Sequence, residues 1–181
     1  MLKEIKGNLF DQKAEAICIT TNGFITTHGT AVLGRGVALG ARALWPEIDA
    51  ILGVKLKFYG NHVYLLTETS DNLLGPHKLP YALFNFPVKP DFIKVNKDMS
   101  NLVPHMRKYA FPGKTMPGYA AKADMAIIKR SCSELMTLVS EKGYSDVILP
   151  RPGCGAGGLN WDTVKKEISD LLGPEIRIIN K

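Results

Sequence analysis

Cysteine is scarce in this chain, which has three, Cys18, Cys132 and Cys154, among 181 residues. They lie far apart and form no C-x-x-C pair, so the sequence predicts neither a disulfide framework nor a zinc site, and no metal or other cofactor. Long apolar runs are missing too, since no stretch reaches the roughly 20 apolar residues that span a membrane. The first seven residues carry charges where a signal peptide has its apolar core. We therefore expect a cytoplasmic protein that does not interact with membranes.

Acidic side chains are fewer than basic ones: the chain has 17 Asp and Glu and 23 Lys and Arg, which gives a formal net charge of +6. A basic balance of this size favours phosphate-bearing or otherwise acidic partners. The excess is concentrated in residues 91–130, which hold eight basic and three acidic side chains. The flanking segments are close to neutral, so nearly all of the net charge is local.

Short β-like runs alternate with longer helical patterns, which is typical of a three-layer α/β domain. A single domain of this length buries roughly 70% of its unfolded surface, so one domain over residues 1–181 is expected. The predicted strands are residues 2–6, 15–20, 62–68, 79–86, 146–149 and 175–179. The predicted helices are residues 37–44, a second helix restarting at Pro46, residues 122–142 and residues 161–172.

Residues 91–121 interrupt this alternation. They contain Pro104, Pro112 and Pro117 and few periodic apolar positions. The pattern predicts a long basic insertion of irregular structure. Such a segment acts either as a solvated lid or as a contact surface for an acidic partner.

Two glycine-rich loops each stand between a predicted strand and a predicted helix, where backbone N–H groups and the helix dipole bind anions. The first, residues 29–38, has neither the spacing of a dinucleotide-binding fingerprint nor the Gly-Lys-Ser/Thr of a Walker loop. The second has four glycines among residues 153–158. Glycine loses more conformational entropy on folding than any other residue, so such a density needs a reason. A backbone that wraps closely around a ligand is one, and a pyrophosphate is the natural candidate. The alternative is that both loops are simple turns.

The residues in and around these loops resemble the macro domains, a family that binds ADP-ribose in a cleft over a mixed β-sheet. Gly7-Asn8-Leu9 resembles the family's Gly-Asp-Ile/Leu opening, and Asn22 stands at the position of its ribose-contacting asparagine. Residues 31–39 and 149–161 resemble its two phosphate loops, in the style of compact macro proteins common in phages and bacteria. The resemblance spans most of the chain and implies a three-layer α/β/α sandwich with a central mixed sheet. We expect a monomer, located in the host cytoplasm if the gene belongs to a phage.

The resemblance implies that ADP-ribose, or an ADP-ribosylated macromolecule, is the partner. It implies that Asn22 holds hydroxyls of the distal ribose while the backbone of the glycine loops clasps the diphosphate. Asn8 replaces an aspartate that accepts from the adenine amino group, and Asp11 is a possible substitute. The residues implied to bind are Asn8, Asp11, Thr20, Asn22, Gly34, Arg35, Gly36, Val37, Gly153, Cys154, Gly155, Ala156, Gly157, Gly158 and Leu159.

Catalysis has three candidate residues. Residues 83–89 end on Asn-Phe-Pro-Val-Lys and resemble the Asn-Phe-Pro-Thr-Lys segment of the DNA ADP-ribosyl glycohydrolase antitoxins, whose lysine attacks the anomeric carbon. Lys89 would need a lowered pKa for this role, because the neutral amine is the reactive form. Relatives pair the lysine with an acid at about the position of Gly157. Asn22, by orienting a water, and His28, as an acid or base in the first loop, are the other candidates.

Two further loop residues allow alternative interpretations. Cys154 is either a thiolate stabilised at a helix start or a small residue that fits between glycines. Arg151 either contacts phosphate or holds its loop in place, and Arg35 is a second possible phosphate ligand.

Three functions stay open. The first is a hydrolase, which releases ADP-ribose from a modified macromolecule or removes phosphate from ADP-ribose 1″-phosphate. The second is a non-catalytic ADP-ribose reader, favoured by the missing loop acid. The third is a nucleic-acid-binding protein that uses residues 91–130, in which the basic side chains are interleaved with aromatic ones. These aromatic residues are Phe92, Tyr109, Phe111 and Tyr119.

Overall fold

The structure is a computed structural model that describes residues 2–68 and 81–181. Within these residues, six strands form a central sheet in the order β1-β8-β7-β2-β4-β3. The strands are β1 (Lys3–Lys6), β2 (Ala16–Thr21), β3 (Tyr64–Thr67), β4 (Ala82–Pro87), β7 (Val147–Pro150) and β8 (Ile176–Asn180). All neighbouring pairs are parallel except β3 with β4, so the sheet is mixed, as the resemblance implied.

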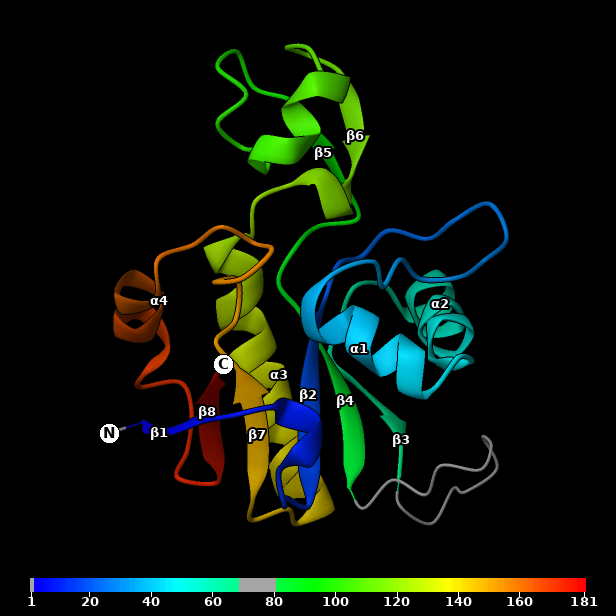
Figure 1. The fold of residues 1–181 in the computed structure, drawn as a ribbon. Coiled ribbons are helices and arrows are strands. Elements are labelled where there is room, and N and C mark those ends of the chain that lie inside the picture. The colour runs from blue at the N-terminus through cyan, green and yellow to red at the C-terminus, as the bar shows by residue number, and fades with distance from the viewer. Residues whose placement is uncertain (1, 69–80) are drawn as a thin grey trace.

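Helices cover both faces of this sheet (Figure 1). The helices are α1 (Gly36–Leu44), α2 (Ile48–Tyr59), α3 (Met125–Lys142) and α4 (Trp161–Ile168). Successive side chains of a strand point to opposite faces, so Ile17 and Ile19 of β2 join one core with α1 and α2, whereas Cys18 joins the other core with α3 and α4. The predicted three-layer α/β fold is therefore confirmed. No helix in the described ranges is both long and apolar enough to cross a membrane.

The predicted helix boundaries hold with small corrections. α3 begins at Met125 because the Asp124 side chain caps it by accepting from two backbone N–H groups, and it ends at Gly143, which has a left-handed φ of 71°. α4 ends at Ile168, four residues before the predicted end, because the chain continues in turns there. Leu172 still packs into the core. Positions 79 and 80 of the predicted strand 79–86 lie outside the described residues.

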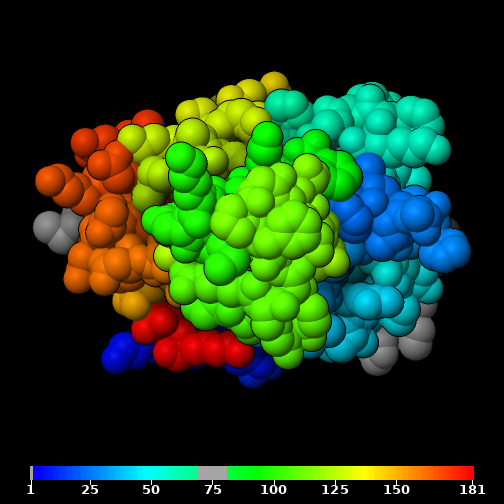
Figure 2. Space-filling view, turned by 90° about the horizontal axis from the view of Figure 1, so that it is seen from above, coloured from blue at the N-terminus to red at the C-terminus, as the bar shows by residue number. Residues whose placement is uncertain are grey.

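Residues 91–121, called the insertion unit below, are more ordered than predicted. The unit holds a two-stranded antiparallel sheet and two 3-10 helices, around a core of its own. These elements are β5 (Phe92–Lys94), β6 (Thr115–Pro117), η2 (Pro104–Tyr109) and η3 (Gly118–Ala120). Its core residues come from loops, from β6 and from η3, all of which are too short to show a regular sequence period, and this is why the pattern predicted irregular structure. The unit follows the end of β4 and protrudes at the top of Figure 1, and Figure 2 shows it above the centre of the molecule.

Candidate functional site

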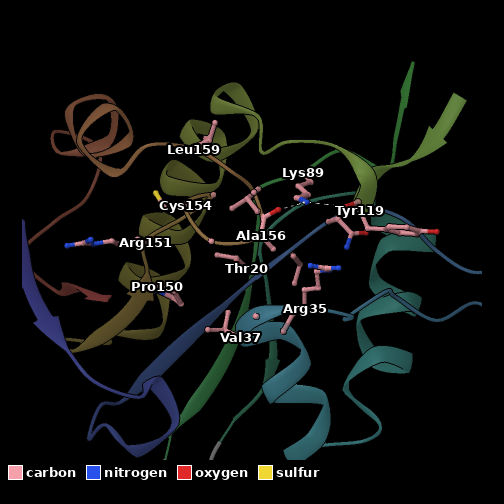
Figure 3. Close-up of a pocket in the computed structure, with 18 of the residues that line it drawn as sticks. Thr20, Arg35, Val37, Lys89, Tyr119, Pro150, Arg151, Cys154, Ala156 and Leu159 are labelled. Atoms are coloured by element: carbon pink, nitrogen blue, oxygen red, sulfur yellow. Dashed lines mark hydrogen bonds between the residues drawn. The ribbon is translucent and has the colours of Figure 1, made fainter. Parts of the chain in front are cut away.

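A cleft of about 960 Å³ lies where the parallel strands end. Residues at or just beyond the ends of four strands line it, among them Asn22 after β2, Lys89 after β4, Arg151 after β7 and Lys181 after β8. Because the carboxyl ends of parallel strands share one edge of a sheet, the loops that follow them meet there, and ligands of open α/β sheets bind at that edge. Figure 3 shows the lining side chains arranged around this space, with Val37 and Pro150 at one end and Lys89 and Tyr119 at the other.

The second glycine loop is folded closely onto itself. Gly153 has a φ of 74°, and a Cβ on Gly157 would lie 2.5 Å from the carbonyl oxygen of Gly153, so neither position accommodates another residue without strain. The N–H groups of Gly155, Ala156 and Gly157 have no hydrogen-bond acceptor among the described residues. A row of unpaired N–H groups at the wall of a cleft is suited to phosphate oxygens.

The first glycine loop places the start of α1 at the same cleft. Gly34, Arg35, Gly36 and Val37 line the cleft, and Arg35 precedes the helix without a side-chain cap. The first N–H groups of α1 therefore stay unpaired within the described structure, and the positive end of the helix dipole lies beside them. The two loops thus face one cavity with the same kind of donor.

Lys89 is buried at the end of β4, with 8% of its surface exposed. Its Nζ donates to the carbonyl oxygens of Tyr119 and Ala156, each at 3.1 Å (Figure 3). Burial, and secondarily the charge of Arg35, lowers the pKa of Lys89 to about 8. In the neutral amine, these two bonds occupy both hydrogens and leave one tetrahedral position for the lone pair. The group therefore has the protonation behaviour that a nucleophilic lysine needs.

Asn22 holds the first loop against the end of β2. Its Nδ2 donates to the carbonyl oxygen of Val32 at 2.9 Å, and its Oδ1 accepts from the N–H of Phe24 at 3.0 Å. The second amide hydrogen and the second lone pair remain for a ligand. Beside it, Thr21 is a lining residue whose buried hydroxyl has no hydrogen-bond partner among the described residues.

The insertion unit, for which the sequence left open a lid or a contact surface, forms one wall of the cleft. His105, Met106, Lys108 and Tyr109 of η2, with Tyr119 of η3, line the cleft. The pKa of His105 is lowered, first by desolvation and then by the charges of Arg35, Lys89 and Lys108, so its imidazole is neutral near pH 7. The local basic excess of residues 91–130 was the signal for this wall, but nothing in the sequence places it over the cleft.

Most of the predicted binding residues lie together in the cleft. Those in its lining are Thr20, Asn22, Gly34, Arg35, Gly36, Val37, Lys89, Gly153, Cys154, Gly155, Ala156, Gly157 and Leu159. Four predicted residues are not in its lining, namely Asn8, Asp11, His28 and Gly158.

The four residues outside the lining have local roles. Asn8 donates to the Asp11 carboxylate at 2.9 Å and caps η1 (Leu9–Asp11) by accepting from the N–H of Phe10. His28 is exposed in a turn closed by the N–H of Gly29. Gly158 has a φ of 74° and donates to the Gly155 carbonyl, so it shapes the loop. The structure therefore does not bring His28 near Lys89.

In the structure, Cys154 lies away from a helix start, and Arg151 contacts other protein groups. α4 begins at Trp161, well after Cys154, and burial raises the pKa of this thiol to about 11, so it stays protonated. The Arg151 guanidinium lies 2.9 Å from Glu4 and over the ring of Trp161, 5.0 Å from its centre. Arg151 thus fastens the second glycine loop to β1 and to the start of α4, and Figure 3 shows it pointing away from the other labelled side chains.

The electrostatics of the cleft favour an anion. Of the described residues that line it, five are cationic and none is Asp or Glu. The cations are Arg35, Lys89, Lys108, Arg151 and Lys181. Within the described ranges, no cluster of three His, Cys, Asp or Glu side chains is suited to a metal ion. The described residues therefore offer a ligand backbone donors, cationic side chains and one buried lysine.

No family model matches the chain. Among curated proteins, it is 26% identical over 177 residues to the DNA ADP-ribosyl glycohydrolase of Thermus aquaticus. The match covers 95% of this chain but 38% of that protein, so the chain spans less than half the length of this relative.

Solved macrodomain structures resemble the whole chain. The macrodomain of Mycobacterium tuberculosis DarG has a TM-score of 0.66 at 20% identity, and that of Thermus aquaticus DarG has 0.64 at 23%; each comparison covers 100% of this chain and 98% of the other. Thermosipho africanus DarTG, solved in complex with ADP-ribose, has a TM-score of 0.62 at 16% identity over 99% of this chain and 42% of that one. The chain therefore has the macrodomain fold, as its loop motifs predicted.

Proposed function

We propose that the cleft binds ADP-ribose and that the chain is an ADP-ribosyl glycohydrolase, which releases ADP-ribose from a modified macromolecule, with DNA as the favoured target. The observation that carries the proposal is Lys89, a buried amine with a pKa of about 8, which is bonded to Ala156 of the second glycine loop in a cleft that both loops of unpaired N–H groups line. The name of the Thermus aquaticus relative and the ADP-ribose bound to Thermosipho africanus DarTG support it.

The arrangement of donors suits the charges of ADP-ribose. Its diphosphate would accept from the N–H groups of Gly155, Ala156 and Gly157 and from the start of α1. Arg35 and Lys108 add positive charge at the rim of the same cavity. Asn22 offers its remaining amide hydrogen and lone pair to the ribose. No cofactor is needed for this binding.

In the proposed reaction, the neutral amine of Lys89 attacks the anomeric carbon of the distal ribose. A C–N bond forms as the bond from that carbon to the macromolecule breaks, and the leaving group takes the bonding electron pair and the proton lost by the amine. Water then attacks the same carbon: a C–O bond forms as the C–N bond breaks, and a proton of the water passes to the amine, which yields ADP-ribose and the free lysine. The cationic, acid-poor cleft stabilises the charge that develops on the leaving group.

The test is an incubation of the chain with an ADP-ribosylated oligonucleotide and, separately, with ADP-ribose 1″-phosphate, followed by chromatography of the products. We expect ADP-ribose from the oligonucleotide and none from a parallel incubation with Lys89→Met. Release from the phosphate ester alone would assign a phosphatase instead. No product from either substrate would reject a hydrolase.

A non-catalytic reader is the second candidate, and one observation favours it. None of the described residues in the lining is a carboxylic acid that could protonate the leaving group. The imidazole of His105, whose pKa is lowered, is the only histidine among the described residues of the lining. Calorimetry that detects ADP-ribose binding, together with an absence of turnover, would assign the reader.

A further inference from the structure

Residues 60–63, which connect α2 to β3, are bonded to two other elements. Asn85 of β4 donates to the carbonyl oxygen of His62 at 2.9 Å. Glu134 of α3 accepts from the N–H of Val63 at 2.9 Å and lies 2.7 Å from Nδ1 of His62. The connection is therefore held from the sheet and from a helix at once, which gives its side chains a fixed base.

Asn61 reaches from this connection to the backbone of the buried lysine. Its Nδ2 donates to the carbonyl oxygen of Lys89 at 2.9 Å, and its own carbonyl oxygen accepts from Arg130 of α3. A Cβ added to Gly23, the residue after Asn22, would lie 2.7 Å from the Asn61 amide. The Asn61 side chain therefore lies between the chain segments that follow β2 and β4, although it is not a lining residue of the cleft.

The amide of Asn61 is held there at a cost. Its Oδ1 is buried and has no hydrogen-bond partner among the described residues. A buried acceptor without a partner destabilises the folded state, and an apolar side chain of the same branched shape would avoid this penalty. Stability alone therefore does not account for an amide at this position, whereas its bond to Lys89 does.

The position of Lys89 depends on this bond. Ser131 of α3 donates to the carbonyl oxygen of Pro87 at 2.8 Å, which holds β4 at its last residue. Two residues further on, Asn61 holds the backbone of Lys89 itself. The lysine Nζ lies at the end of a four-carbon stem, so a small rotation of the backbone at the base of this stem displaces the amine by a larger distance.

We propose that Asn61 is a positioning residue, which fixes the backbone of Lys89 and thereby directs its amine into the cleft, an inference that rests on the proposed function. Without the bond, the amine can turn from the carbonyl oxygens of Tyr119 and Ala156 toward water. It is then misplaced for attack on the anomeric carbon. It is also less buried, so its pKa rises toward the ordinary lysine value of about 10.4.

The experiment compares two variants that disturb the same bond from different sides. Asn61→Leu keeps the branched shape but removes the donor. Gly23→Ala keeps the amide but places a methyl group against it. The matched control is Asn101→Leu, because Asn101 also donates from its amide to a backbone carbonyl at 2.9 Å, that of Lys94, and lies outside the cleft lining.

Three quantities are measured for each protein, besides thermal unfolding to verify that it is folded. Carbon-13 NMR of lysine-labelled protein gives the pKa of Lys89, whose signal is identified by its absence from Lys89→Met. Single-turnover kinetics with an ADP-ribosylated oligonucleotide give the rate and its pH profile. Calorimetry gives the affinity for ADP-ribose.

We expect Asn61→Leu to raise the pKa of Lys89 above its value of about 8 and to move the midpoint of the pH profile upward with it. The rate at pH 8 should fall by about 10², as for a misplacement of about 1 Å, with unchanged affinity for ADP-ribose. Gly23→Ala should raise the pKa of Lys89 in the same direction, and it supplies the test if Asn61→Leu does not fold. Asn101→Leu should match the unaltered chain in all three quantities.

The titration of Lys89 is independent of turnover, so it separates this proposal from the proposed function. An unchanged pKa in both Asn61→Leu and Gly23→Ala would overturn the positioning role, whether or not the chain is a hydrolase. An equal shift in Asn101→Leu, or a loss of ADP-ribose affinity in Asn61→Leu as large as the loss of rate, would also overturn it. A raised pKa in a chain that releases no ADP-ribose would support the role of Asn61 and reject the hydrolase.

Discussion

The Nζ of Lys89 donates to the carbonyl oxygen of Ala156 at 3.1 Å, and this bond joins the end of β4 to the second glycine loop. The two residues are 67 positions apart in the sequence. Their contact places the only buried lysine of the described residues next to the N–H groups that suit a diphosphate. The loop that we propose to hold the phosphates therefore also positions the amine.

Replacing this lysine separates turnover from binding. We expect Lys89→Met to lower the rate of ADP-ribose release by about 10² or more, equivalent to roughly 3 kcal/mol of transition-state stabilisation. ADP-ribose affinity is expected to change much less, because backbone donors supply most of the contacts. Single-turnover kinetics and calorimetry measure the two quantities.

Two companion variants make this result specific. Lys89→Arg keeps a positive charge but cannot deprotonate, so it should be as inactive as Lys89→Met. An active arginine variant would contradict a nucleophilic role. Lys55→Met, on α2, removes a lysine outside the cleft lining and is expected to behave as wild type.

The pKa of Lys89 sets the pH dependence of the reaction. Because the neutral amine is the reactive form, activity rises with pH, and kcat/KM should be half-maximal near pH 8. Each pH unit below 8 lowers the neutral fraction about tenfold. A rate that falls as pH rises from 6 to 9 would disagree with this assignment.

Arg35 offers an internal check on that midpoint. Its charge is the second cause of the lowered pKa of Lys89, so Arg35→Gln raises this pKa and moves the midpoint of the pH profile upward. Arg42→Gln removes the same charge from α1, where Arg42 pairs with Asp49, and should leave the midpoint in place. A shift of equal size in both variants would mean that the profile follows net charge and not this one contact.

Sequence patterns predicted the features of the site that follow from strand order. Asn22, Lys89 and the loop from Gly153 each come directly after a buried strand, and parallel strands bring their ends to one edge. Regular periodicity is a strong signal in α3, whose buried residues repeat every three to four positions. The fold and the composition of the two loops could therefore be predicted from local patterns.

The remaining features depend on contacts that have no local pattern. The core residues of the insertion unit lie in loops and in elements too short to be periodic, so neither its core nor its wall at the cleft could be predicted. His28 directly precedes the first glycine loop in the sequence, but it lies in a turn that leaves its side chain exposed to solvent. Asn8 fits a motif, yet its amide is engaged by Asp11 and Phe10.

The second glycine loop gives a prediction about shape. A methyl group on Gly157 would meet the Gly153 carbonyl at 2.5 Å and the Ala123 side chain at 2.7 Å. Gly157→Ala should lower the free energy of unfolding by about 1–3 kcal/mol and weaken ADP-ribose binding. Gly155→Ala is the matched control for stability, since a Cβ at Gly155 would have no atom within 4 Å. Equal unfolding midpoints for the two variants, measured by thermal denaturation, would contradict this close packing.

Arg151 gives a prediction about how the same loop is held. Glu4 accepts from Arg151 at 2.9 Å, from Lys165 at 2.6 Å and from the indole of Trp161 at 3.2 Å, so one carboxylate anchors both ends of the loop. If Arg151 acts through Glu4, Arg151→Gln and Glu4→Gln weaken ADP-ribose binding by similar amounts. The double variant then loses no more than either single variant, because residues in one network are not additive.

The opposite pattern would assign Arg151 to the phosphate. In that case Arg151→Gln weakens binding strongly, Glu4→Gln has little effect, and the double variant shows the sum. Calorimetry of the four proteins at one salt concentration distinguishes the two results. We expect the non-additive one, because the guanidinium is already engaged by the Glu4 carboxylate and the Trp161 ring and has little freedom to turn toward a ligand.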